Sequence, residues 1–135
     1  MSNREEIIKK LKSFGVSPTN QRVDIAQILF ARPQHLSAEQ ILKMVNEESS
    51  STASKATIYN TLGLFTKKGL VRELIVDPTK VFYDSNMTNH FHFYNADTGM
   101  LSDIANDAIH FDKLPELPEG TESSGIEVIV RIKNS

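Results

Sequence analysis

The spacing of the hydrophobic side chains changes near residue 70, and this change limits the folds open to the chain. Before that point apolar residues recur at the intervals of amphipathic helices, and after it they come in short β-rich runs. Residues typical of helix N-termini precede three of the helical stretches: Thr19, Ser37 with Gln40 three positions later, and Ser54. The sequence predicts four helices, at residues 3–14, from 19 to about 32, at 38–48 and at 55–68.

Two short β-rich runs, residues 70–76 and 80–84, follow the fourth helix and flank the turn Asp77-Pro78-Thr79. Helices followed by a hairpin in this order are typical of a winged helix-turn-helix, whose recognition helix enters the major groove of DNA. We expect the fourth helix to play this part. The predicted DNA-binding residues are Lys55, Thr57, Tyr59, Asn60 and Arg22. The alternative is a helical scaffold that binds no nucleic acid.

The rest of the chain predicts a small unit of about three strands. A polar linker at 85–89 leads to a second hairpin, 90–96 and 99–104, and the chain closes on a strand at 126–132. A short helix is expected at 105–111, and 114–120 is too rich in Pro and Gly to be regular. The fold class is therefore α+β. The domains are a winged-helix DNA-binding domain (1–84), a linker (85–89) and a dimerisation and metal-sensing domain (90–135).

The small second unit carries an apolar strand that invites pairing with a second copy, so we expect a homodimer. A helix-turn-helix protein that reads a two-fold symmetric operator in double-stranded DNA also needs two copies.

The distribution of charge along the chain agrees with the division into two domains. Residues 1–72 carry a net charge of +5 and residues 73–135 a net charge of −7, which suggests a polyanion-binding module joined to something else. A solvated basic surface is the plainer interpretation.

Composition narrows the remaining possibilities. The chain has no cysteine, so disulfides, thiolate zinc sites (a structural zinc held by four cysteines among them) and iron–sulfur clusters are excluded. No apolar run approaches the roughly 20 residues of a membrane helix, and the N-terminus has no signal-peptide core. We therefore expect a cytoplasmic protein that has no membrane partner.

The segment between Asp84 and Asp103 contains a candidate metal site. His90 and His92 are two residues apart, so in a strand both imidazoles point to one face. Imidazoles joined by carboxylates suit Fe(II), Mn(II), Co(II) or Zn(II). His35, between the second and third helices, lies in the predicted DNA-binding module. A metal bound by all five residues would bridge the two domains and act as a switch for DNA binding.

The same ligands allow two other functions. Two histidines and one carboxylate form the facial triad of non-haem iron oxygenases, which leaves coordination positions open for O₂. A metal-buffering or protein-interaction adaptor is the other possibility. No nucleophile elbow, phosphate loop or zinc-hydrolase motif is present. We therefore expect a regulator and not an enzyme.

Taken together, several segments resemble the ferric uptake regulator (Fur) superfamily of bacterial metal-dependent transcription factors. The matching segments are GVSPTNQRVDIAQIL, HLSAEQIL, ASKATIYNTLGLFTKKGLVREL, the HFH stretch and TGMLSDI. The resemblance implies a repressor with a regulatory Fe(II) or Mn(II) site between its domains, although zinc could occupy the site in purified protein. By the same resemblance the metal ligands are His35, Asp84, His90, His92 and Asp103, and Tyr59 is the major-groove tyrosine.

Two subgroups share features with this chain. The segments YNTLGLFT and LPELPEGTESSGIEVIVRIK resemble the iron response regulator (Irr) subgroup, which is linked to iron homeostasis and haem sensing. Haem is thus a further candidate, although only His90-Phe91-His92 stands in place of a three-histidine run and the haem-associated cysteine is absent. Aspartate at both 84 and 103 resembles the peroxide-sensing (PerR) subgroup, in which Fe(II) directs oxidation of its histidine ligands. Peroxide sensing is the alternative function.

The chain departs from the family pattern at several positions. Asn95 and Thr98 stand where the first of two CxxC pairs of a structural zinc site would be. Asn89 and Phe91 occupy positions of a second His/Asp site that family members often carry. An arginine commonly follows the recognition tyrosine, and here it is Asn60; Ser17 stands where many members have a lysine directed at the minor groove. We therefore expect a different operator preference.

Overall fold

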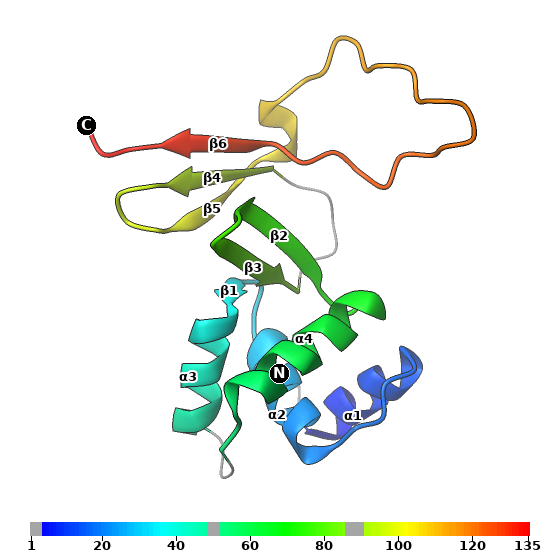
Figure 1. The fold of residues 1–135 in the computed structure, drawn as a ribbon, viewed down its shortest axis with the longest axis vertical. Coiled ribbons are helices and arrows are strands. Elements are labelled where there is room, and N and C mark those ends of the chain that lie inside the picture. The colour runs from blue at the N-terminus through cyan, green and yellow to red at the C-terminus, as the bar shows by residue number, and fades with distance from the viewer. Residues whose placement is uncertain (1–3, 49–51, 86–90) are drawn as a thin grey trace. The chain divides into compact units, whose positions relative to one another are not determined.

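The computed structural model describes residues 4–48, 52–85 and 91–135, which divide into two compact units, Met1–Met87 and Thr88–Ser135 (Figure 1). Helix and sheet are both present, which confirms the predicted α+β class. Among the described residues no helix combines the length and the apolar character needed to cross a membrane.

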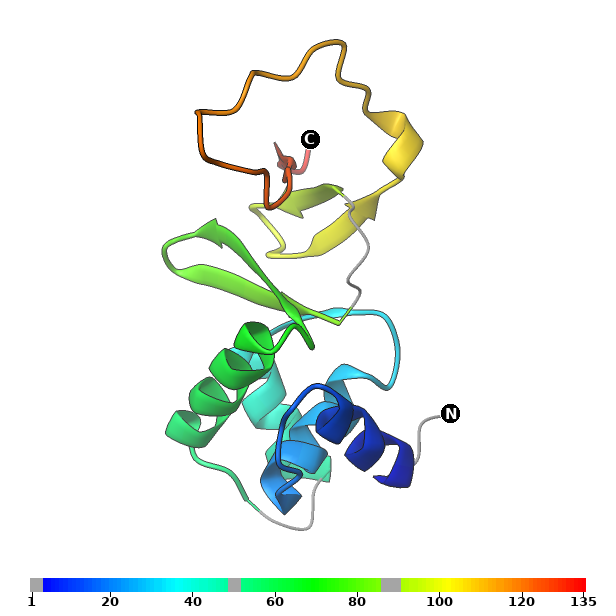
Figure 2. The ribbon, with the colours of Figure 1, turned by 90° about the vertical axis from the view of Figure 1, so that its right-hand side faces the viewer.

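Four helices and a three-stranded antiparallel sheet form the first unit. The helices are α1 (Arg4–Ser13), α2 (Asn20–Leu29), α3 (Ala38–Glu48) and α4 (Lys55–Lys67), and the strands are β1 (His35–Ser37), β2 (Arg72–Asp77) and β3 (Lys80–Asp84). The strand order is β1-β3-β2. In Figures 1 and 2 the four helices lie on one side of this sheet. The four predicted helices and the hairpin after them are present, and β2 and β3 form the wing.

Side chains at the helix N-termini explain where the helices begin. Thr19 accepts a hydrogen bond from the Arg22 N–H (3.3 Å), and Ser54 accepts one from the Thr57 N–H (3.1 Å). Ser37 and Gln40 exchange hydrogen bonds between side chain and backbone, as a capping box requires. Each bond pairs a backbone N–H that has no partner within its helix. All three predicted caps are therefore confirmed.

The core of the first unit lies among its helices. Ile58, Leu62 and Phe65 of α4 are fully buried at 0% exposure, at the spacing predicted for its apolar stripe. They belong to one cluster with buried residues of the other helices, among them Leu11 and Ile41. Burial of large apolar side chains is the main favourable term in folding. Because one face of α4 is buried in this core, the position of its exposed face relative to the other helices is fixed.

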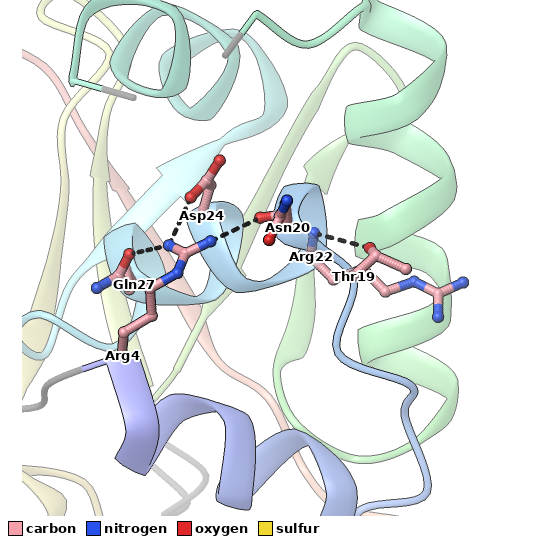
Figure 3. A network of polar contacts seen from close by, with 6 residues as sticks. All are labelled: Arg4, Thr19, Asn20, Arg22, Asp24 and Gln27. Carbon is pink, nitrogen blue, oxygen red and sulfur yellow. Dashed lines mark hydrogen bonds and ion pairs between the residues drawn. The ribbon is translucent and has the colours of Figure 1, made fainter. Parts of the chain in front are cut away.

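A polar clamp joins α1 to α2 at the edge of this core (Figure 3). The Arg4 guanidinium donates to Asp24 Oδ1 at 2.7 Å and to Gln27 Oε1 at 2.8 Å, both through Nη1. Its Nη2 donates to the Asn20 carbonyl at 3.4 Å. Because one rigid guanidinium contacts three residues of α2, the two helices are held in a defined register.

The second unit is a three-stranded sheet with a long irregular loop. Its strands are β4 (Phe91–Asn95), β5 (Leu101–Ile104) and β6 (Ile129–Ile132), in the order β5-β4-β6, with β4 and β5 antiparallel and β4 and β6 parallel. The predicted hairpin is present. Between the 3₁₀ turn η1 (Asn106–Ala108) and β6 the chain leaves the sheet as the irregular loop seen in orange in Figure 1.

The second helix ends at Leu29 and not near Arg32, and several other predicted ends are displaced by one or two residues. Three larger differences from the prediction remain. The helix expected at 105–111 is only the three-residue η1, because so short a segment with no buried residue cannot offset the cost of helix nucleation. The strand expected at 126–132 begins only at Ile129, since the paired part of β4 runs from His92 to Asn95. The strand β1 was not predicted: it is three residues long and exists through its pairing with β3.

A polar network, called here the asparagine clasp (Asn95, Asp97 and Asn134), ties the end of the chain to the β4–β5 turn. The Asn95 side-chain amide donates to Asn134 Oδ1 at 2.9 Å, and the Asn134 backbone N–H donates to Asp97 Oδ2 at 2.8 Å. Asn95 Oδ1 accepts the backbone N–H groups of Asp97 and Thr98. The clasp thus fastens the end of β6 beside the turn.

Candidate metal and DNA-binding sites

The first unit presents one histidine–aspartate pair. His35 on β1 is registered directly opposite Asp84 on β3, so their side chains lie on one face of the sheet. His35 Nε2 is 3.3 Å from Asp84 Oδ2, and the two side chains are only 14% and 4% exposed. Both donors are therefore held by strand pairing within the unit.

The second unit presents a matching pair built in the same way. His92 on β4 is registered opposite Asp103 on β5, and His92 Nε2 is 3.4 Å from Asp103 Oδ1. The His92 side chain is 2% exposed and that of Asp103 is 53% exposed. An imidazole nitrogen beside a carboxylate oxygen is a donor set suited to first-row divalent metals. Each unit therefore offers one imidazole and one carboxylate as candidate metal ligands.

Four of the five predicted metal ligands thus fall into these two pairs, and His90 lies outside the described residues. Sequence reasoning grouped the five residues but did not foresee which histidine pairs with which aspartate. The pairing of His35 with Asp84 depends on β1, whose three residues are too short a run to show strand alternation.

The predicted DNA-binding residues of α4 lie in its first two turns. Lys55, Tyr59 and Asn60 are exposed, Tyr59 at 42%, and Thr57 is half-buried next to the Ser54 cap. The fifth predicted residue, Arg22 on α2, donates through Nη1 to the Ser17 carbonyl at 2.9 Å. This bond fixes the guanidinium at the turn between α1 and α2 and uses one of its five N–H donors.

Tyr59 also contacts two charged side chains. Its hydroxyl donates to Glu39 Oε1 on α3 at 2.9 Å, and the Lys55 ammonium lies 5.9 Å from the ring centroid, within cation–π range. The bond to Glu39 raises the pKa of Tyr59, and burial adds to the effect. The backbone N–H of Glu39, then the Tyr59 hydroxyl, lower the pKa of the Glu39 carboxyl. Sequence reasoning missed Glu39, because twenty residues separate it from Tyr59.

The first unit therefore has the architecture of a winged helix-turn-helix protein, with α3 and α4 as the helix pair and β2–β3 as the wing. The model of the ferric uptake regulator family matches residues 13–128, which is most of the chain. The chain belongs to this family, whose members are metal-responsive transcription regulators that bind DNA and dimerise.

Individual relatives agree with this assignment. The chain is 31% identical over 115 residues to the peroxide-responsive repressor PerR of Staphylococcus epidermidis, covering 85% of this chain and 73% of that protein. The Vibrio cholerae ferric uptake regulator superposes with a TM-score of 0.73 at 21% identity, covering 94% of this chain and 98% of that one. The Pseudomonas aeruginosa regulator solved with manganese gives 0.70 at 24% identity, covering 93% and 96%. At these identities the two structures show a common fold.

Proposed function

We propose that this protein is a metal-dependent repressor of iron homeostasis whose regulatory Fe(II) or Mn(II) ion is bound by His35, Asp84, His90, His92 and Asp103. The observation that carries the proposal is the pair of His–Asp sets, each held by strand register, in a member of a metal-responsive regulator family. Three nitrogen and two carboxylate ligands match the preferences of these ions. The two carboxylates also balance the charge of a divalent cation.

We assign a separate role to each domain from the positions of the proposed metal ligands. Residues 1–84 form the DNA-binding domain and supply His35 and Asp84, residues 85–89 form the linker, and residues 90–135 sense the metal and dimerise. One ion that takes ligands from both domains would restrict their relative orientation, so metal binding would select the arrangement of the two recognition helices that fits an operator. Without the ion this restraint is lost and specific DNA affinity falls.

The proposal can be tested with single histidine substitutions in the full-length protein. We expect His35→Ala and His92→Ala each to lose Mn(II) binding and Mn(II)-dependent retention of operator DNA, while circular dichroism shows the fold retained. Loss of a residue that only orients a metal ligand typically costs about 10- to 100-fold in metal affinity or activity. Loss of a ligand itself should cost at least as much. The matched control is His110→Ala, because His110 is exposed and belongs to neither pair.

Two results would contradict the proposal. If His35→Ala and His92→Ala bind Mn(II) and DNA as the wild type does, these residues are not regulatory ligands. If the wild type consumes O₂ with a small substrate and has no affinity for duplex DNA, the site is that of an oxygenase. Metal binding without any metal-dependent DNA binding would indicate a metal-buffering protein instead.

A second candidate function is peroxide sensing, which is favoured by relatives that are peroxide-responsive repressors at 31% and 33% identity. In that case the histidine and aspartate ligands would hold Fe(II), which would supply the redox chemistry for oxidation of a ligand: hydrogen peroxide would give one oxygen atom to an imidazole and leave as water. Mass spectrometry of peptides containing His35, His90 and His92 after peroxide treatment distinguishes the two functions. Oxidation with Fe(II) and none with Mn(II) supports peroxide sensing, whereas no oxidation with either ion supports metal sensing alone.

A further inference from the structure

Glu39 is a charged residue close to the recognition helix that takes no part in the candidate metal site, and its carboxylate favours the N-terminus of α3 as well as contacting α4. It lies in the first turn of α3 and is exposed, and its Oε1 accepts a hydrogen bond from the Tyr59 hydroxyl at 2.9 Å. The contact joins the two helices of the helix-turn-helix through side chains only. Lys55, one turn before Tyr59 on α4, lies over the same ring.

The direction of this hydrogen bond determines what Tyr59 can do. An ionised carboxylate can only accept, so the phenol must donate to it. The pKa of Glu39 is lowered by its own backbone N–H, by Tyr59 and by the nearby Lys55 and Lys80 charges, which keeps the carboxylate ionised at neutral pH. While the Tyr59 O–H donates its hydrogen bond to Glu39, the phenol oxygen offers only lone pairs to any further partner.

This restriction separates phosphates from bases. DNA phosphates present only acceptors, so a Tyr59 hydroxyl that donates to Glu39 has no proton for them, and the Glu39 charge also repels them. The amino groups of adenine and cytosine in the major groove are donors, and the thymine methyl group packs against apolar surface. All three can meet a phenol in this state, because they need an acceptor or a ring face.

We propose that Glu39 is a positioning residue that fixes Tyr59 as a reader of base edges in the major groove and prevents it from binding phosphate. The inference rests on the proposed DNA-binding function and adds to it a determinant of sequence specificity. Glu39 need not touch DNA itself. Its effect is exerted through the orientation and the hydrogen-bonding state of the Tyr59 hydroxyl.

The test uses the full-length, Mn(II)-loaded protein and a library of randomised DNA duplexes, from which bound sequences are selected and counted. The base-pair position read by Tyr59 is the one whose preference disappears in Tyr59→Ala, which removes both the hydroxyl and the ring face. We expect Glu39→Ala to weaken the preference at that position about 3- to 10-fold, the equivalent of one hydrogen bond. Binding to unselected duplexes should not weaken, because the variant removes a negative charge.

Two further variants separate the hydrogen bond from the charge. Glu39→Gln removes the same charge as Glu39→Ala but keeps a side-chain oxygen that can accept the hydrogen bond from the Tyr59 hydroxyl. It should therefore retain most of the preference. Glu47→Ala removes a carboxylate from an exposed site on the same helix and should leave the preference unchanged. In the double variant Glu39→Ala/Tyr59→Phe, loss of Glu39 should add nothing to the loss of the hydroxyl.

Specific outcomes would overturn the inference. Equal effects of Glu39→Ala and Glu39→Gln would assign the effect to charge alone. Additive losses in the double variant would show that Glu39 acts independently of Tyr59. A preference in Glu39→Ala equal to that in Glu47→Ala would show that Glu39 does not contribute to specificity at all. If the wild type itself selects no sequence from the library, the proposed function fails, and this inference fails with it. The two failures can be told apart, because failure of the proposed function is seen in the wild type, whereas failure of this inference alone is seen only in the variants.

Discussion

At the scale of single residues, two neighbouring buried side chains of β3 have different tasks. Tyr83 and Asp84 are adjacent on the strand and are 6% and 3% exposed. Alternation sends them to opposite faces of the strand, so Tyr83 joins the hydrophobic core while Asp84 faces His35. The same short strand therefore contributes to folding through one residue and to the candidate metal site through the next.

Tyr83 gives the stability of this unit a dependence on alkaline pH. Burial, together with the nearby Glu73 charge, raises the pKa of Tyr83 above its ordinary value. The unfolded chain loses the phenol proton first, at about pH 10, so above that point it binds fewer protons than the folded protein does. The contribution of Tyr83 to the free energy of unfolding should therefore be fully present below the ordinary tyrosine pKa. It should be lost as pH rises through the pKa that Tyr83 has in the folded protein.

Urea unfolding at a series of alkaline pH values measures this effect. The comparison is with Tyr83→Phe, which has no ionisable phenol and should show a shallower decline in the free energy of unfolding. Every other ionisable group is present in both proteins, so the difference between the two curves isolates Tyr83. Parallel curves would mean that Tyr83 ionises with the same pKa in the folded and unfolded chains.

At the scale of elements, β6 depends on contacts at its two ends. Its parallel ladder with β4 is short, and the backbone bonds His92 N–H to Val128 O (3.1 Å) and Ala96 N–H to Ile132 O (3.0 Å) extend it on either side. The asparagine clasp then fastens the chain just beyond the ladder. Val130 and Ile132 are 38% and 39% exposed, so burial contributes little to holding this strand within the chain.

The clasp can be tested through Asn134. We expect Asn134→Ala to remove the hydrogen bond from Asn95 and to destabilise local structure by about 0.5–1.5 kcal/mol. Hydrogen exchange should quicken at the amides of His92 and Ala96, which bond to the β6 region, while the amides of α4 are unaffected. Asn106→Ala, in an exposed turn of the same unit, is the control. Unchanged exchange at Ala96 would show that the ladder alone holds β6.

Local and long-range signals explain which elements could be predicted. The helices of the first unit follow from periodicity and from caps such as Ser54, which act over three or four residues. The strand β1 could not be predicted, since its pairing partner β3 lies more than forty positions away and nothing within His35–Ser37 reveals it. The shortening of the last strand likewise depends on the length of β4, a distant segment.

The same distinction applies to the candidate sites. Residue type and spacing were enough to group His35, Asp84, His92 and Asp103 as metal ligands, a grouping that stays a prediction. Which of them face one another depends on strand register, which sequence does not give. The contact of Tyr59 with Glu39 was missed for the same reason: two exposed residues on different helices carry no shared sequence signal.

At the scale of the whole molecule, dimerisation is expected to involve the second unit. Its exposed large apolar side chains include Ile126, Val130 and Ile132 on or next to β6. An apolar stretch of this kind, on a sheet with few buried residues of its own, is suited to burial against a second copy.

We expect Val130→Lys to shift the protein from dimer to monomer in sedimentation velocity at a concentration at which the wild type is dimeric, because a lysine in an apolar interface must be desolvated. DNA binding should weaken in parallel, since one monomer reaches only one half-site. Ser123→Lys introduces the same charge in the exposed loop of the unit and should remain dimeric. A dimeric Val130→Lys variant would place the interface elsewhere.

The asparagine clasp has a consequence for the redox chemistry of the second unit. It closes the second unit with amide and carboxylate groups, and the chain contains no cysteine. Thiols are oxidised in steps that end irreversibly, whereas amides and carboxylates have no comparable redox ladder. Peroxide therefore leaves this closure chemically untouched. Methionine side chains, which oxidise to sulfoxides, lie outside the groups that form the clasp.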